Sequence, residues 1–248
     1  MSILLADDPK LGKTLVFDQD FTKLKDIDEK VWLFNDGPVY NNEKQKYTKK
    51  PAKNAWIENG RLIIEARKEN GVITSGRLES HGSWKYGYIE IIAKVPRGRG
   101  TWPAAWMLAT TIKESDPAKA KPWPDCGEID IMENVGFDPD SFHFNLHSKK
   151  YNHMKNNSKK NMVVVKESTP QFHTYGLEWS ENRIRMTMDK KEVFLAVNTE
   201  NDHDAWPFNE PYFMILNLAI GGDWGGQKGV DDAIFPARYE IKSVKIYQ

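Results

Sequence analysis

The sequence predicts an all-β protein, a sandwich of two antiparallel sheets, and three observations support this. Helical periodicity is scarce along the 248 residues. Short runs rich in β-branched and aromatic residues recur at roughly even spacing, and turn-forming Gly, Pro, Asn and Asp separate them. Many short strands with regular turns are typical of a sandwich. The length suits one large domain, so we expect residues 1–248 to form a single domain.

Each expected strand is an apolar or alternating run bounded by turn signals. In chain order the expected strands are Leu15–Phe17, Ala55–Ile57, Leu62–Arg67, Tyr88–Lys94, Ala104–Ala109, Glu128–Met132, Phe142–Leu146, His173–Trp179, Arg183–Met188, Lys191–Ala196, Tyr212–Ala219 and Glu240–Tyr247. Glu58-Asn59-Gly60 predicts a tight hairpin, because Gly accepts a positive φ. Thr110–Pro124 and the lysine-rich Ser148–Lys160 show no period, so we expect two loops, the second of them a solvated one.

Composition excludes several classes of partner. The 35 basic and 35 acidic residues balance, so no net field attracts nucleic acid or an anionic membrane. No apolar run approaches the ~20 residues of a membrane-spanning helix, and Met1–Ala6 is too short for a signal peptide. Cys126 is the sole cysteine, which excludes an internal disulfide. No base is placed beside it, so we expect a small buried residue rather than a nucleophile.

Three carboxylates stand close together in a mostly apolar segment, Gly127-Glu128-Ile129-Asp130-Ile131-Met132-Glu133-Asn134. Because side chains alternate between the faces of a strand, Glu128 and Asp130 share one face and Ile129 faces the other. Strict alternation would place Met132, and not Glu133, beside the carboxylates. We therefore expect a β-bulge near Ile131–Met132 that returns Glu133 to the acidic face.

This arrangement has a chemical use. Crowded carboxylates raise one another's pKa, so at least one should keep a proton at neutral pH. A protonated acid beside an ionised carboxylate can cleave a glycosidic bond. Along a straight bulged strand Glu128 and Glu133 are ~13 Å apart, whereas a retaining mechanism needs carboxyls ~5–5.5 Å apart. We therefore expect a curved strand with a concave acidic face, in a bent sheet that forms a cleft for an extended polysaccharide.

The segment Glu128-Ile129-Asp130-Ile131-Met132-Glu133 matches the active-site signature of glycoside hydrolase family 16 in its bulged form. The segment Gly100–Leu108 resembles the family segment upstream of it, and Asn217–Gly226 resembles the laminarinase-like branch. Weaker matches are Asn41–Thr48, Thr74–Leu78 and His143–His147. The resemblance extends from about Leu15 to Tyr247, nearly the whole chain.

The resemblance implies a fold and a mechanism. The fold is a jelly-roll β-sandwich of two curved antiparallel sheets with a concave substrate cleft, one catalytic domain over residues 1–248. The mechanism is a retaining double displacement. By motif position Glu128 is the implied nucleophile and Glu133 the implied general acid/base, while Asp130 would hydrogen-bond the nucleophile and help set which carboxyl holds the proton. The residues alone give the same trio without deciding which glutamate has which role.

Aromatic and polar side chains are expected to bind the sugar. In the family, tryptophans at the positions of Trp102, Trp106 and Trp224 line the glycan cleft, and Trp123 lies close to the acidic strand in sequence; core packing is the alternative for each. His147 matches a histidine that lies near the acid/base on the leaving-group side, with a structural role as the alternative. The polar candidates, each with a turn or surface role as the alternative, are Asn42, Glu43, Arg77 and Asn217.

Some relatives bind a structural calcium on the convex face. Asp20 stands where a glutamate is usual, and Lys242 stands where the last strand would supply an aspartate. A lysine is not a calcium ligand. This departure puts the structural calcium in doubt, and the expected mechanism requires no metal and no cofactor.

The expected activity is endo-hydrolysis of β-1,3-glucan or mixed-linkage β-1,3-1,4-glucan. One alternative is a galactanase for agar-like or carrageenan-like polymers, with the lysines of Ser148–Lys160 facing sulfate. The other is a catalytically idle β-glucan-binding lectin, although such relatives lose one glutamate and both are present here. Because polymers do not cross membranes, we expect an extracellular or cell-surface protein, a mature chain without its leader, and a monomer.

Overall fold

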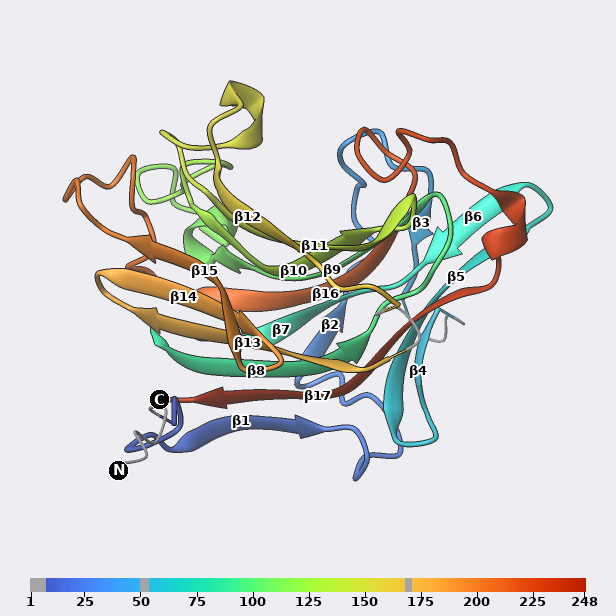
Figure 1. Cartoon of the computed structure of the whole chain (residues 1–248), viewed down its shortest axis with the longest axis horizontal. Coiled ribbons are helices and arrows are strands. Elements are labelled where there is room, and N and C mark those ends of the chain that lie inside the picture. Colours follow the sequence, from blue (N-terminus) through green and yellow to red (C-terminus); the bar gives the residue numbers. More distant parts are fainter. Residues whose placement is uncertain (1–7, 50–53, 168–170) are drawn as a thin grey trace.

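The computed structural model describes residues 8–49, 54–167 and 171–248. The segment Met1–Ala6 lies outside these residues. Within the described ranges the strands form two curved sheets that stack on one another (Figure 1). This is the sandwich that the sequence predicts, in its jelly-roll form.

One sheet carries the site and is called the concave sheet. Its order is β12-β11-β10-β9-β16-β7-β2, and every pair is antiparallel. Its strands are β2 (Trp32–Phe34), β7 (Arg77–Trp84), β9 (Thr101–Ala109), β10 (Glu128–Val135), β11 (Asp138–His147), β12 (Lys159–Val164) and β16 (Tyr212–Ile220).

The second sheet covers the back of the first. Its main order is β15-β14-β13-β8-β17-β5-β6-β3, with β1 on β17 and β4 on β5. The strands are β1 (Leu15–Asp20), β3 (Lys46–Tyr47), β4 (Ala55–Glu58), β5 (Arg61–Glu69), β6 (Val72–Ser75), β8 (Gly87–Lys94), β13 (His173–Ser180), β14 (Arg183–Met188), β15 (Lys191–Val197) and β17 (Ala237–Tyr247). The short β3 runs parallel to β6, so the expectation of purely antiparallel sheets is wrong at this pair.

Every run expected to be a strand lies within one. The Glu58–Arg61 hairpin also forms, with Asn59 and Gly60 both at positive φ. The sequence does not indicate β2, β3, β6, β7 and β12, which are short or carry polar residues on both faces. Thr110–Pro124 lacks strands but begins with the 3₁₀ helix η1 (Thr110–Lys113). Ser148–Lys160 contains η2 (His153–Lys155), and its last two residues belong to β12.

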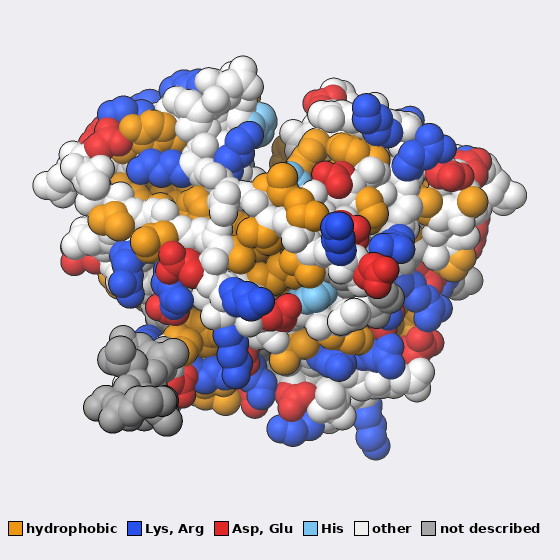
Figure 2. Space-filling view, in the orientation of Figure 1, with side chains coloured by type: hydrophobic (Ala, Val, Ile, Leu, Met, Phe, Trp, Pro, Cys, Tyr) orange, Lys and Arg blue, Asp and Glu red, His pale blue; other side chains and the backbone are white. Residues whose placement is uncertain are grey.

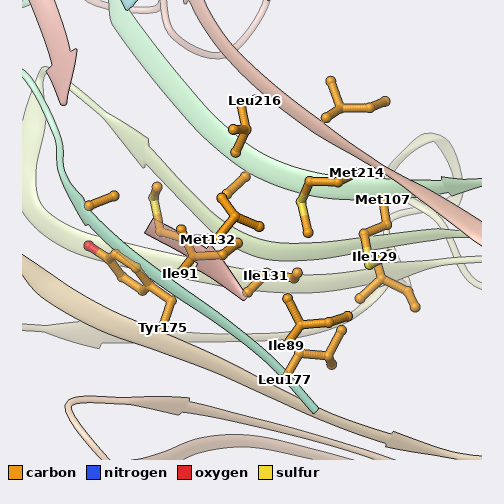
Figure 3. Close-up of a cluster of buried hydrophobic side chains, with 14 of the residues drawn as sticks. Ile89, Ile91, Met107, Ile129, Ile131, Met132, Tyr175, Leu177, Met214 and Leu216 are labelled. Carbon is orange, nitrogen blue, oxygen red and sulfur yellow. The ribbon is translucent and has the colours of Figure 1, made fainter. Parts of the chain in front are cut away.

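The core lies between the two sheets. Side chains that leave the back of the concave sheet, such as Ile129 and Met214, meet those of β8 and β13, such as Ile89 and Leu177 (Figure 3). Ile131 and Met132 both join this core and are fully buried. The residues left on the other side of these strands therefore face the concave surface.

The front of the concave sheet is open. Loops rise from both ends of its strands, and Figure 2 shows a hollow between two lobes at the top of the molecule. A third 3₁₀ helix, η3 (Asp232–Ile234), precedes β17. None of the helices in the described part of the chain is long and apolar enough to span a membrane.

Candidate active site

Strand β10 contains the expected bulge. Asp130 pairs with Trp106 of β9 and Met132 with the next residue, Ala105, so one extra residue stands on β10. Opposite β11, three steps from Asp130 to Glu133 match two steps from Asn145 to His143. The extra residue sends Ile131 and Met132 together into the core. Glu133 therefore returns to the concave face beside Glu128 and Asp130, and this prediction is confirmed.

Neighbouring strands and loops hold each glutamate by hydrogen bonds. The indole N–H of Trp123 donates to Glu128 Oε2 over 2.9 Å. The indole N–H of Trp102 donates to Glu133 Oε1 over 3.0 Å, and Asn145 Nδ2 donates to Glu133 Oε2 over 3.0 Å. Donors of this kind fix the direction of a carboxyl group without neutralising it.

The surroundings shift the proton affinity of all three carboxyls. Burial, and then the charge of Asp130, raises the pKa of Glu128 well above its ordinary value. Burial, and then the charge of Glu133, does the same to the pKa of Asp130. Burial also raises the pKa of Glu133, against the opposing N–H donors of Trp102 and Asn145. The group therefore keeps a proton at a pH where isolated carboxyls are ionised, as the crowding in the sequence predicts.

His147 lies beside Glu128 and Asp130, whereas its family match places it near the acid/base Glu133. Its Nε2 is 3.2 Å from Asp130 Oδ2 and 3.8 Å from Glu128 Oε1, and β-sheet pairing sets it opposite Glu128. The side chain is buried, 6% exposed, and does not line the cleft. We therefore assign it to the support of the carboxylates rather than to direct sugar contact.

The carboxylates lie on the floor of a cleft of about 680 Å³. Trp102, Trp106 and Trp123 all line it, as the sequence predicts. So do three of the four polar candidates, Glu43, Arg77 and Asn217. Large flat apolar surfaces beside polar groups suit sugar rings, which carry apolar faces and hydroxyl edges.

A hydrogen-bonded group surrounds Trp106. The Trp106 indole N–H donates to Asn217 Oδ1 over 2.7 Å, and Asn217 Nδ2 donates to Tyr47 Oη over 3.0 Å. The Arg77 guanidinium lies over the Trp106 ring, 5.3 Å from its centroid. Arg77 also bonds the buried Glu79. These contacts hold Trp106 at a fixed angle in the cleft.

Trp224 and Asn42 stand one layer further out and are absent from the cleft lining. The Trp224 ring meets Trp102 edge-on at 5.4 Å and His143 at 4.8 Å. Asn42 Nδ2 donates to Asp223 Oδ1 over 2.8 Å, which ties two loops together. Asn42 therefore joins two loops at the border of the cleft, and Trp224 packs edge-on against Trp102.

The glycines around Trp224 are needed for close packing. A Cβ on Gly225 would lie 2.9 Å from the Cβ of Trp102. Gly222 has a φ of +78°, and a Cβ there would lie 2.8 Å from the carbonyl oxygen of Asn41. This glycine-rich segment therefore supports the tryptophan that holds Glu133.

Several cleft residues were not predicted from the sequence. Asn145, on the same face of β11 as His147, could have been found by alternation from that histidine. Glu79 could have been found in the same way from Arg77, had β7 been identified. Tyr47, Lys113, His153 and Met154 also line or border the cleft, but their loops and short strands carry no periodic signal.

One cluster among the described residues could offer ligands to a metal ion. Among them, Glu128, Asp130 and His147 bring one ligand atom each within 4.8 Å of one another. The two carboxyls lie on the floor of the cleft, and His147 contacts them from outside its lining. On the convex side, Asp20 bonds Thr22 and pairs with Lys23, and the Lys242 ammonium lies over the Phe172 ring.

Comparison with known proteins gives one family. The model of glycosyl hydrolases family 16 matches residues 37–241. The beta-glucanase of Rhodothermus marinus is 42% identical over 84% of this chain and 75% of its own length. The chain spans less of some relatives, such as 40% of glucan endo-1,3-beta-glucosidase A1 of Niallia circulans, which is 28% identical.

Solved structures are similar to this chain in sequence and in fold. The laminarinase from Rhodothermus marinus superposes with a TM-score of 0.88 at 39% identity, over 95% of this chain and 97% of that one. A mutant of SCLam, a non-specific endo-beta-1,3(4)-glucanase with 1,3-beta-D-cellobiosyl-glucose at its active site, gives 0.87 at 38% identity over 96% and 95%. The chain therefore belongs to glycosyl hydrolases family 16.

Proposed function

We propose that this protein is an endo-acting, retaining β-glucanase that cleaves β-1,3-glucans and mixed-linkage β-1,3-1,4-glucans. The observation that carries the proposal is the bulge in β10, which brings Glu128 and Glu133 to one face at the floor of the cleft. Two carboxyl groups on one concave face are the equipment for glycoside hydrolysis, and the family signature at Glu128–Glu133 implies the double-displacement route.

In this mechanism the two glutamates have different tasks. Glu133 protonates the departing glycosidic oxygen while the carboxylate of Glu128 attacks the anomeric carbon and forms a glycosyl-enzyme. Glu133, now ionised, then takes a proton from water, which attacks the same carbon and releases Glu128. Asp130 titrates together with the two glutamates and so helps to set which carboxyl is ionised.

A neutral glucan is the substrate that the charges favour. Arg77 and Lys113, two cations in the cleft lining, both pair with the buried Glu79. Lys149 and Lys150 of the lysine-rich loop pair with Asp125, Asp204 and Glu200. These four cations are therefore already paired with carboxylates, which weakens the galactanase alternative, although a keratan-sulfate endo-1,4-beta-galactosidase is 28% identical.

The test is reducing-end release, with sizing of the products, from laminarin, barley mixed-linkage glucan and agarose in parallel. Oligosaccharides from both glucans are expected. Products from barley glucan alone would restrict the enzyme to mixed linkages, and products from agarose alone would replace the glucan assignment. Binding to glucans without products from any polymer would identify the lectin alternative.

We further propose that the enzyme acts as a monomer outside the cell, without a metal. The substrate is a polymer that cannot cross a membrane, and every step above uses carboxyl groups and water. Activity should survive exhaustive dialysis against EDTA, and light scattering should give the mass of one chain. Loss of activity that calcium restores would contradict the metal-free assignment.

A further inference from the structure

Strand β12 is an outer strand of the concave sheet, and its two faces differ. Asn161 and Val163 point into the sandwich, where Asn161 Nδ2 donates to the carbonyl oxygen of Val193 and Val163 packs against the core. Because side chains alternate, Lys160, Met162 and Val164 point to the concave side. Met162 is 45% exposed and Val164 is 59% exposed.

The strand register joins these residues to the active site. Met162 pairs with His143, which in turn pairs with Glu133. Glu133 and Met162 are therefore separated by two strand spacings, about 10 Å. A sugar chain bound at Glu133 can extend over this distance. Lys160 pairs with Asn145, the residue that donates to Glu133.

Exposed apolar side chains on an outer strand usually invite unwanted association. Here the register places the apolar pair on the same face of the sheet as Glu133, beyond the edge of the cleft in which a sugar polymer is proposed to lie. Methionine is a flexible and polarisable side chain that adapts to the apolar face of a pyranose ring.

We propose that Met162 and Val164 form an outer subsite for the part of the glucan that extends from Glu133 across β11. This inference rests on the proposed function. It adds the direction in which the glucan crosses the sheet, because the cleft at Trp106, Arg77 and Asn217 lies on one side of β10 and β12 lies on the other. The glucan would thus contact the whole width of the concave sheet.

The experiment compares long and short laminari-oligosaccharides, labelled at one end, as substrates of the intact enzyme. The variant Met162→Ser/Val164→Ser removes the apolar pair. The control Leu195→Ser/Val197→Ser removes side chains of similar exposure, 50% and 46%, from β15 at the edge of the other sheet. Thermal melts check that each variant folds, and tryptophan fluorescence gives binding separately from turnover.

The ratio of kcat/KM for long over short substrates should fall about five- to tenfold in the β12 variant, as expected for one lost apolar contact, and should stay within about twofold of wild type in the control. Met162→Trp should raise the same ratio. Because each substrate is labelled at one end, the labelled products show which end of the glucan lies over β12.

Other results would overturn the inference. An unchanged ratio in the β12 variant removes the subsite while leaving the glucanase assignment intact. A wild-type dimer that the β12 variant loses, with an unchanged ratio, identifies the patch as a contact between two copies. A wild type that neither cleaves nor binds glucans removes the proposed function and the subsite together.

Discussion

At the scale of single residues, the active site consists of three carboxyls whose supports come from distant parts of the chain. The sequence predicted the carboxyls, because acidic side chains in an apolar strand are costly without a function. It also predicted Trp102 and Trp123 as cleft residues, but not their hydrogen bonds to Glu133 and Glu128. The Asn145 contact depends on strand register, which a single sequence does not specify.

Replacing either glutamate tests its role. We expect Glu128→Gln and Glu133→Gln to lower kcat on the order of 10²–10⁴-fold or more, because each removes a proton-transfer or nucleophilic group. Azide added to Glu128→Gly should give an α-glycosyl azide, detected by NMR. A β-azide would exchange the two roles, and a glutamine variant that keeps more than about a tenth of the activity would remove that residue from catalysis.

The contact between Asn145 and Glu133 should shift the pH profile. The N–H donor of Asn145 stabilises ionised Glu133 and lowers its pKa. In Asn145→Ala the pKa of Glu133 therefore rises, and the acid stays protonated to higher pH. The alkaline limb of kcat/KM should move to higher pH, whereas Asn161→Ala, on the neighbouring strand, should leave it in place. A limb that moves to lower pH would contradict this assignment.

The raised pKa of Glu128 should also affect stability. A group whose pKa is higher in the folded than in the unfolded protein contributes its stability below the unfolded value of about 4.3, and this is lost as pH rises through the folded pKa. Glutamine does not titrate. The Tm of Glu128→Gln relative to wild type should therefore increase from acidic to mildly alkaline pH.

A control with the opposite sign is available. Hydrogen bonds from Lys150 and Tyr151 lower the pKa of Glu200, so its contribution is lost as pH falls. The relative Tm of Glu200→Gln should not rise with pH. If the relative Tm of the two variants changed with pH in the same way, burial of Glu128 would be excluded as the cause of the change.

At the scale of elements, the bulge in β10 is the decisive feature. It was predictable because two rules conflicted in one segment: strict alternation, and the need for three acids on one face. The strands β7 and β12 were not predictable in this way, because their outward residues are polar or exposed and their pairing is long-range. Their positions come from the register of their neighbours.

Deleting Met132 tests the bulge directly. Strict alternation then puts the glutamate at 133 in the place of Met132, so it stays on the concave face beside Glu128 and Asp130 without a bulge. We expect a lower Tm, because the buried Met132 side chain is lost from the core, and more activity than in Glu133→Gln, because the acid/base group stays in the cleft. Deleting Lys119, an exposed loop residue, is the control and should change neither greatly. A deletion variant as inactive as Glu133→Gln would mean that the shortened strand does not return to strict alternation.

At the scale of the whole molecule, two curved sheets share one core, and the concave sheet spreads the site over its width. The all-β class was predictable from the spacing of apolar runs and turns. The curvature was predictable only through the chemistry, because two glutamates on one strand must converge. The exact layout of the lobes was not, because loops such as 148–158 are held by their own polar contacts, for example from the buried Asn152 to Ser148.

The charge balance of the molecule predicts a weak dependence on salt. The net charge is zero, and Arg77 and Lys113 share Glu79 in the cleft. Initial rates on laminarin should therefore vary less than about twofold between low and high ionic strength, because no field steers a neutral polymer. Parallel assays with added bovine serum albumin at the same salt concentrations control for enzyme that is lost non-specifically. A steep fall with salt would favour a sulfated substrate.

The burial of Cys126 has a practical consequence. Its side chain is 1% exposed, and burial, with the nearby charge of Glu128, raises the pKa of the thiol to about 12. Reagents that attack thiolates should therefore leave the native chain untouched. A cysteine introduced at the exposed Met154, on the border of the cleft, would be the one site to take up a maleimide dye. Because Cys126 takes up no dye, all fluorescence would come from position 154. The labelled protein would therefore report polysaccharide binding in the cleft without a signal from a second site.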